Sequence, residues 1–167
     1  VLKIEKESGK NVDIVVMIQG DEPLICPEMI DAAIEPMLRD KTVNITNLMA
    51  EIKTVKDFED PNEVKVVVDK FDNALYFSRE PIPSRKKSAS EVMMMKQVCV
   101  IPFRRDFLME YTKMKPTPLE IIESVDMMRI LENGLKVRMV LTKHETKSVD
   151  NLKDLEVVNK MMKSDTM

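Results

Sequence analysis

An acidic pair follows a run of apolar residues near the start of the chain, in the segment QGDEP at residues 19–23. The run itself, residues 13–18, predicts a fully buried strand of a parallel sheet, because almost all of its residues are apolar and several are β-branched. Ligands of open α/β sheets bind at the carboxyl ends of strands. Mg²⁺ prefers one or two carboxylates together with phosphate oxygens of a substrate, so Asp21 is a candidate metal ligand. Gly, Asp and Pro also form turns, and a plain turn stays an open alternative.

A second carboxylate, Asp150, directly precedes the last predicted helix, residues 151–163. Beside Asp21 it would complete a pair of metal-binding carboxylates. The sequence does not show that the two meet. The alternative is that Asp150 or Asn151 caps the helix, which is a common role for both residue types.

Other polar side chains have two possible roles. Arg79 follows a predicted strand, residues 74–78, where it could clamp a carboxylate or phosphate through two hydrogen bonds, or point into solvent. Glu120 falls in the first turn of a predicted helix, residues 118–133, where the helix dipole stabilises an acid. That position explains Glu120 structurally without any substrate, and it also allows contact with sugar hydroxyls. His144, in a polar loop, is expected at the surface.

The elements that must position these residues alternate between strands and helices, which predicts an α/β fold in one domain. The predicted strands cover residues 13–18, 43–50, 64–69, 74–78, 96–101 and 136–141, and the predicted helices cover 27–39, 54–59, 104–113, 118–133 and 151–163. The strands at 64–69 and 74–78 read as a hairpin. Gly134 is expected to end the helix before it.

Composition excludes several classes of function. The 26 basic and 29 acidic residues give a net charge of −3, which argues against nucleic-acid binding. No apolar run reaches the roughly 18 residues of a membrane span, and we expect a soluble, cytoplasmic protein. One His and two Cys cannot build a multi-histidine metal centre or a disulfide framework. Cys99 is expected to be inert core. With three Gly, these residues also lack a glycine-rich loop that cradles phosphates.

Five segments, in this order, are similar to one known family. They are VVMIQGDEPLI at 15–25, DPNEVKVVVD at 60–69, ALYFSREPIP at 74–83, PTPLEIIESVDMMRILENGLKVRMV at 116–140 and SVDNLKDLE at 148–156. On these segments the chain resembles the 3-deoxy-manno-octulosonate cytidylyltransferases, the enzymes that make CMP-Kdo. The resemblance covers most of the chain.

The resemblance implies a sheet like that of the nucleotide-diphospho-sugar transferases, with an antiparallel β insertion at about residues 64–102. It implies transfer of CMP from CTP to Kdo with Mg²⁺, release of pyrophosphate, and a role in bacterial surface polysaccharide synthesis. Asp21 and Asp150 match the catalytic Mg²⁺ ligands of the family. The substrate-binding positions that it implies are Gln19, Arg79, Glu120 and Glu123. The insertion is expected to contribute to a homodimer contact.

Two departures from the family pattern qualify these expectations. The usual RHxGIYxY pattern is altered at residues 96–103, where Gln97 replaces the His and Ile101 the first Tyr. Gln97 is therefore expected to bind the sugar, which is Kdo or a related eight- or nine-carbon ulosonic acid. The family's phosphate-binding segment, of the form ARxxSTRLPGKPL, has no counterpart in these residues. We therefore expect residues 1–167 to form a single, incomplete domain whose activity alone is open.

Two readings from other classes remain beside the enzyme. The chain could be a non-catalytic remnant that dimerises, or a sugar-binding module that works with a separate N-terminal half. A sheet that lacks strands would expose an edge, so self-association of the isolated chain is expected.

Overall fold

The structure, a computed structural model, describes residues 1–87 and 93–163. Within these ranges the elements in chain order are α1 (Leu2–Ser8), β1 (Ile14–Ile18), α2 (Pro27–Arg39), β2 (Thr46–Glu51), α3 (Val55–Glu59), β3 (Lys65–Val68), β4 (Ala74–Ser78), β5 (Met95–Val98), β6 (Val100–Arg104), α4 (Arg105–Tyr111), α5 (Pro118–Glu123), α6 (Met127–Glu132), β7 (Arg138–Leu141) and α7 (Leu152–Lys163). The bounds of α2 are those that the sequence predicts. In the described part, no helix is both long and apolar enough to span a membrane.

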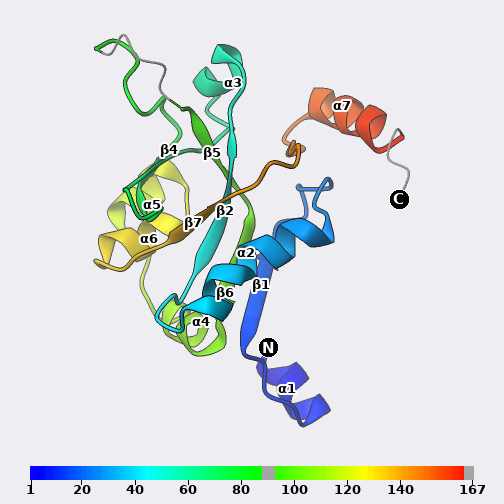
Figure 1. Cartoon of the computed structure of the whole chain (residues 1–167), viewed down its shortest axis with the longest axis vertical. Helices are drawn as coiled ribbons and strands as arrows, with labels where there is room; N and C mark the ends of the chain where they lie inside the picture. The colour runs from blue at the N-terminus through cyan, green and yellow to red at the C-terminus, as the bar shows by residue number, and fades with distance from the viewer. Residues whose placement is uncertain (88–92, 164–167) are drawn as a thin grey trace.

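The strands form a five-stranded sheet in the order β4-β3-β5-β2-β7 and a two-stranded sheet of β1 and β6. Among the described strands, β2 and β7 are the one parallel pair. The helices α5 and α6 lie on one side of the larger sheet, while α2 lies against β2 and β6 (Figure 1). The expected α/β fold with an antiparallel element, including the β3–β4 hairpin, is confirmed.

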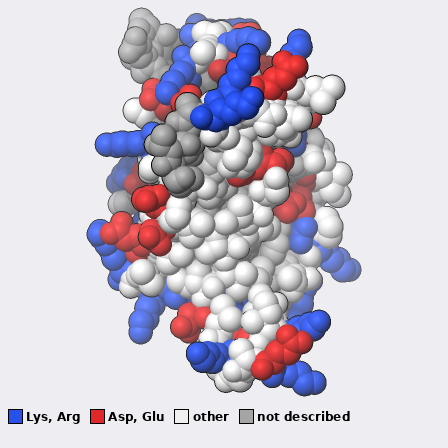
Figure 2. Space-filling view, turned by 90° about the vertical axis from the view of Figure 1, so that its right-hand side faces the viewer, with Lys and Arg blue, Asp and Glu red and all other residues white. Residues whose placement is uncertain are grey.

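The prediction of a fully buried parallel strand at residues 13–18 is wrong. Strand β1 runs antiparallel to β6, with Val16 opposite Pro102, and β6 is its one strand partner in the described part. Its side chains are half-buried, and Ile18 is 43% exposed. Because the apolar run alone does not reveal how many neighbours a strand has, it overstated the burial of β1. The face of the molecule on the right-hand side of Figure 1, where β1 lies, carries a broad area with few charges (Figure 2).

The single strand predicted at residues 96–101 is two strands, β5 and β6, that belong to different sheets. The strand is interrupted at Cys99, between β5 and β6, and the buried side-chain amide of Asn47 spans this strand break. Asn47 Nδ2 donates to the carbonyl oxygens of Val98 and Val100 over 2.7 and 3.4 Å. The break frees the peptide groups of Cys99, which bond instead to the loop after β1.

The helix predicted at residues 118–133 is also two elements, α5 and α6. Ser124 adopts a left-handed conformation, with φ at 52°, and so ends α5. The prediction for Gly134 is confirmed. Gly134, at φ 72°, donates to Leu131, and the next amide, Leu135, donates to Ile130, which closes α6 in a Schellman motif.

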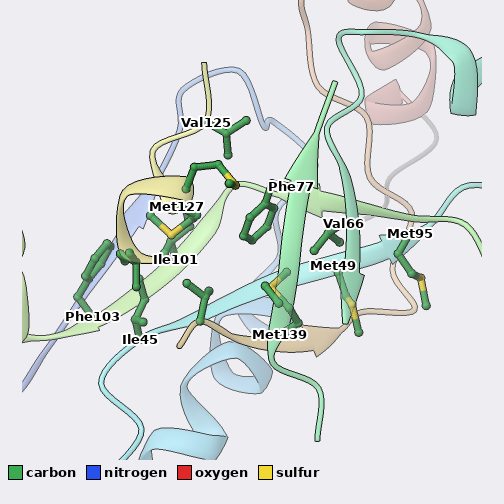
Figure 3. Packing of buried hydrophobic residues seen from close by; sticks show 14 of the residues in the cluster. Ile45, Met49, Val66, Phe77, Met95, Ile101, Phe103, Val125, Met127 and Met139 are labelled. Carbon is green, nitrogen blue, oxygen red and sulfur yellow. The ribbon is translucent and has the colours of Figure 1, made fainter. Parts of the chain in front are cut away.

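Two apolar clusters lie on opposite faces of β2. Met49 belongs to a large cluster with Phe77 and Met127, whereas its neighbours Leu48 and Ala50 pack against α2. The alternation follows the two-residue period of a strand. Figure 3 shows the larger cluster, in which side chains from β2, β3, β4 and β7 gather with those of α6. Of the 14 methionines in the described ranges, seven are buried, namely Met29, Met37, Met49, Met95, Met127, Met128 and Met139. These seven belong to the core.

Candidate active site

A cavity of about 170 Å³ lies at the carboxyl end of β1, where the break at Cys99 and the loop before α7 meet it. Five of the seven candidate site residues line it, namely Gln19, Asp21, Arg79, Gln97 and Asp150. Three of these, Arg79, Gln97 and Asp150, come from parts of the chain far from the QGDEP loop. The cavity is thus assembled by the tertiary fold.

The loops that carry Asp21 and Asp150 are joined by a hydrogen bond. The amide of Val149 donates to the carbonyl oxygen of Asp21 over 2.9 Å. The helix cap of α7 is Asn151, whose Oδ1 accepts from the amides of Lys153 and Asp154. Asp150 is therefore not needed as a cap. Its carboxylate accepts a hydrogen bond from the Ser148 hydroxyl over 2.9 Å and faces the cavity.

The chemistry of the cavity fits a divalent cation. Asp21 Oδ1 is buried and has no hydrogen-bond partner, a costly state for a carboxylate oxygen unless a cation or donor meets it. Acidic side chains outnumber basic ones by five to two in the lining, the acids being Asp21, Glu22, Glu63, Asp126 and Asp150. Among the described residues, no group of three or more His, Cys, Asp or Glu side chains could hold a metal ion by itself. A bound Mg²⁺ would therefore take further oxygens from substrate or water, as Mg²⁺ usually does.

Glu22, the second acid of QGDEP, was not singled out by the sequence. Its Oε1 accepts a hydrogen bond from the amide of Cys99 over 3.2 Å, and burial raises its pKa. The backbone amide of Gln19 donates to the carbonyl oxygen of Cys99 over 3.3 Å. The QGDEP loop is therefore fixed to the strand break on both sides of Asp21. Burial raises the pKa of the Cys99 thiol to about 12, which supports the expectation that it is inert. The expectation that it belongs to the core is wrong, because Cys99 is half-buried and lines the cavity.

Gln97 lines the cavity from β5, and its amide nitrogen is already engaged. Gln97 Nε2 donates to Asn47 Oδ1 over 2.6 Å, so the residue that spans the strand break also holds Gln97. Its neighbour Lys96 also lines the cavity and pairs with the buried Glu63 over 2.9 Å. Lys96 and Glu63 were not among the site residues predicted from the sequence. The available signal for Lys96 was a charged residue at the start of the strand predicted at residues 96–101.

Arg79 lines the cavity, but its guanidinium group mainly braces the chain. Arg79 Nε, Nη1 and Nη2 donate to the carbonyl oxygens of Glu123, Pro61 and Ser124 over 2.7, 2.8 and 3.2 Å. The Glu123 carboxylate accepts from the amide of Arg79 over 2.8 Å and from the Tyr76 hydroxyl over 3.0 Å. Glu123 does not line the cavity. The contacts of both side chains point to positioning of the β4 end against α5.

Glu120 also lies outside the cavity. Its Oε2 accepts from Arg129 Nε over 2.8 Å and from the amide of Thr117 over 3.0 Å, and Oε1 pairs with Arg129 as well. These hydrogen bonds hold the pKa of Glu120 below its usual value. The structural role, one of the two left open for Glu120, is the one that these contacts support: the Thr117 amide bond closes a capping box, and the Arg129 ion pair ties α5 to α6. The same first-turn position that suggested contact with a sugar directs the carboxylate toward its own helix end and α6.

A larger cavity, of about 500 Å³, lies between the carboxyl ends of β2 and β7 and α7. Asp21, Asp150, Gln97 and Arg79 do not line it, so we assign the site by its chemistry and not by size. His144 lies at its rim and is exposed, as expected. Its Nδ1 is 3.6 Å from Cys26 Sγ.

Comparison with known proteins gives a consistent result. Residues 1–146 match the model of a family described as "Cytidylyltransferase". The chain is 42% identical to 3-deoxy-manno-octulosonate cytidylyltransferase of Geobacter metallireducens, over 89% of this chain and 62% of the relative. It is 43% identical to the enzyme of the same name from Geobacter sulfurreducens, over 95% of this chain and 68% of the relative. The chain thus spans 62 to 68% of the length of these relatives.

Solved structures agree. The fold is similar to that of CMP:2-keto-3-deoxy-manno-octonic acid synthetase complexed with CTP, with a TM-score of 0.83 and 31% identity. That match covers 96% of this chain and 66% of the other. A glucose-1-phosphate thymidylyltransferase described as putative, from Bacillus anthracis, shares the fold more distantly, with a TM-score of 0.55 and 14% identity.

Proposed function

Because this chain belongs to the cytidylyltransferase family, we propose that the protein that contains it transfers CMP from CTP to an ulosonic acid. The sugar is Kdo or a related eight- or nine-carbon acid, and the CMP-sugar feeds synthesis of a bacterial surface polysaccharide. One observation carries the proposal. The loops of Asp21 and Asp150 meet at a single cavity, where a buried oxygen of Asp21 has no partner. That arrangement suits a reaction between two anionic substrates.

In the proposed reaction, the anomeric hydroxyl oxygen of the sugar bonds to the α-phosphorus of CTP. The bond from that phosphorus to the bridging oxygen of the β-phosphate breaks, pyrophosphate leaves, and the hydroxyl proton passes to water. No protein nucleophile is needed, so the residues act by holding the reactants together. Lys96 supplies a positive charge beside the cavity, and Gln97 offers a polar side chain to the sugar.

Asp21 and Asp150 are the residues that we propose hold Mg²⁺. When bound, Mg²⁺ offsets the charge of the phosphates and orients their oxygens. Gln19 and Glu22 fix the Asp21 loop through the peptide group of Cys99. Arg79 and Glu123 hold the end of β4 at the edge of the cavity, and Glu120 stabilises the α5–α6 unit.

We further propose that the protein is a homodimer that contacts its partner through the insertion at about residues 64–102. Two apolar side chains at the β3–β4 hairpin, Phe71 and Leu75, are 59% and 60% exposed, which supports an apolar contact there. A cytoplasmic location follows from the use of CTP, a cytoplasmic nucleotide.

The test is pyrophosphate release from CTP and Mg²⁺ with either Kdo or N-acetylneuraminate, an alternative nine-carbon ulosonic acid. The chain of 167 residues and the product of the whole reading frame that encodes it are assayed in parallel. We expect release with one of the sugars from the whole product. Release by the whole product and not by the chain would mark residues 1–167 as an incomplete catalytic unit. No release with either sugar, from either protein, would contradict the proposal and favour the non-catalytic reading.

A further inference from the structure

A chain of ion pairs runs from the cavity to the last helix. Lys96 Nζ pairs with Glu63 Oε2 over 2.9 Å, and Lys147 Nζ pairs with Glu63 Oε1 over 3.2 Å. Lys147 also pairs with Asp154 Oδ1 over 3.3 Å. The four side chains come from β5, the turn before β3, the loop after β7, and α7. The ion pairs therefore connect four segments that are separate along the sequence.

The ion pairs are largely shielded from water. The side chains of Glu63 and Lys96 are 8% and 11% exposed, and that of Asp154 is 13% exposed. A buried charge without a partner is costly, so Glu63 fixes the positions of both lysines. Burial by itself would lower the pKa of Lys147, but the Glu63 and Asp154 carboxylates outweigh it and raise that pKa. Lys147 therefore stays charged and bound to both acids.

The last acid of this series of ion pairs, Asp154, contacts the backbone of Asp150. The other oxygen of Asp154, Oδ2, accepts from the amides of Asp150 and Asn151 over 3.3 and 3.2 Å. Asp154 thus holds Lys147 with one oxygen and the peptide group of Asp150 with the other. The loop is further held by the amide of Val149, which donates to Asp21.

We propose that Lys147, held by Glu63 and Asp154, is a positioning residue that sets where Asp150 lies at the cavity. The proposal rests on the function proposed above, in which Asp150 holds Mg²⁺. Lys147 itself does not line the cavity. It acts on the metal-binding carboxylate from behind, as residues that orient metal ligands commonly do, with effects of about 10- to 100-fold on metal affinity.

The test uses Lys147→Met in the whole protein, with Lys143→Met, an exposed lysine of the same loop, as the matched control. Mg²⁺ binding is measured by titration calorimetry in the presence of CTP without sugar, so that no turnover occurs. We expect Lys147→Met to weaken Mg²⁺ binding about tenfold. We expect Lys147→Arg to restore it to within about threefold, since Arg keeps the charge, and the control to bind like the wild type. Hydrogen exchange in the metal-free protein should be faster at the amides of Asp150 and Asn151 in Lys147→Met.

Two outcomes would overturn the proposal. The first is Mg²⁺ affinity within about twofold of wild type in folded Lys147→Met, and the second is an equal loss in Lys147→Arg. If Lys147→Met does not fold, Asp154→Asn takes its place, because the amide oxygen can still accept from Asp150 while the ion pair is lost. Asp150→Asn separates the two proposals. If it also binds Mg²⁺ normally, the metal assignment in the proposed function fails, whereas loss in Asp150→Asn alone contradicts only the role of Lys147.

Discussion

The amide of Val149 donates a hydrogen bond to the carbonyl oxygen of Asp21 over 2.9 Å, so the two acidic loops of the candidate site are joined through their backbones. Val149 directly precedes Asp150. Both carboxylates can therefore face one cavity without any contact between their side chains. The bond uses main-chain atoms, so it persists when either side chain is replaced. Substitutions at Asp21 and Asp150 should for that reason report on chemistry more than on folding.

We expect Asp21→Asn and Asp150→Asn, each made in the whole protein, to lower turnover by about two orders of magnitude or more. Each change keeps the size of the side chain and removes a charge that the metal needs. The measurement is pyrophosphate release at saturating CTP and sugar over a range of Mg²⁺ concentrations. Asp31→Asn, on the exposed side of α2, is the control and should behave like the wild type. Near-normal rates of the two variants at saturating Mg²⁺ would contradict the metal assignment.

Glu120→Gln should destabilise the protein at pH 7 by about 3 kcal/mol, because it leaves the shielded guanidinium of Arg129 without its charged partner. Arg129 holds the pKa of Glu120 below its usual value of 4.5. A lowered pKa gives stability that is present above the unfolded value and is lost as the pH falls through the native value. The difference between wild type and variant should therefore shrink below pH of about 4.

Urea unfolding measures this difference at about pH 7 and at about pH 3.5. These two pH values lie above and below the usual pKa of a glutamate carboxyl group. Glu110→Gln, at an exposed position of α4, serves as the control and should change stability little at either pH. A difference between wild type and Glu120→Gln that does not depend on pH would argue against the ion pair as its source.

The two thiols should react at very different rates. Burial raises the pKa of Cys99 to about 12, so almost no thiolate is present at pH 8. Cys26 lies half-buried before α2, with its sulfur beside the exposed His144. Iodoacetamide followed by mass spectrometry should label Cys26 first, and Cys26→Ser should leave a single, slow thiol. Equal labelling of both residues in the folded protein would show that the strand break at Cys99 opens readily.

Leu75→Lys should convert the proposed homodimer into a monomer, because it places a charge on the exposed apolar end of the insertion. Sedimentation equilibrium over a range of concentrations measures the change. Leu38→Lys is the matched control, since Leu38 is 71% exposed on α2, outside the insertion. A dimer that survives Leu75→Lys, or is lost equally in Leu38→Lys, would place the contact elsewhere.

Much of the local structure could be predicted from the sequence. The bounds of α2, the β3–β4 hairpin and the end of α6 at Gly134 all agree with the structure. Each depends on residues that are neighbours along the chain, such as a cap, a turn or a periodic apolar face. The interactions that decide these features are complete within a few residues, so the sequence itself contains them.

The sequence by itself therefore determined the types of most elements and the candidate residues for the proposed chemistry, including Asp21 and Asp150. Only the tertiary structure decided that the loops of these two acids meet and that the strand is interrupted at Cys99. It also decided that Arg79 bonds to Glu123 and that Glu120 bonds to Arg129. Local patterns record which face of a strand or helix is apolar, and do not record which distant segment lies against it. A hydrogen bond between remote residues depends on the packing of every element between them, and that information appears only when the chain is folded.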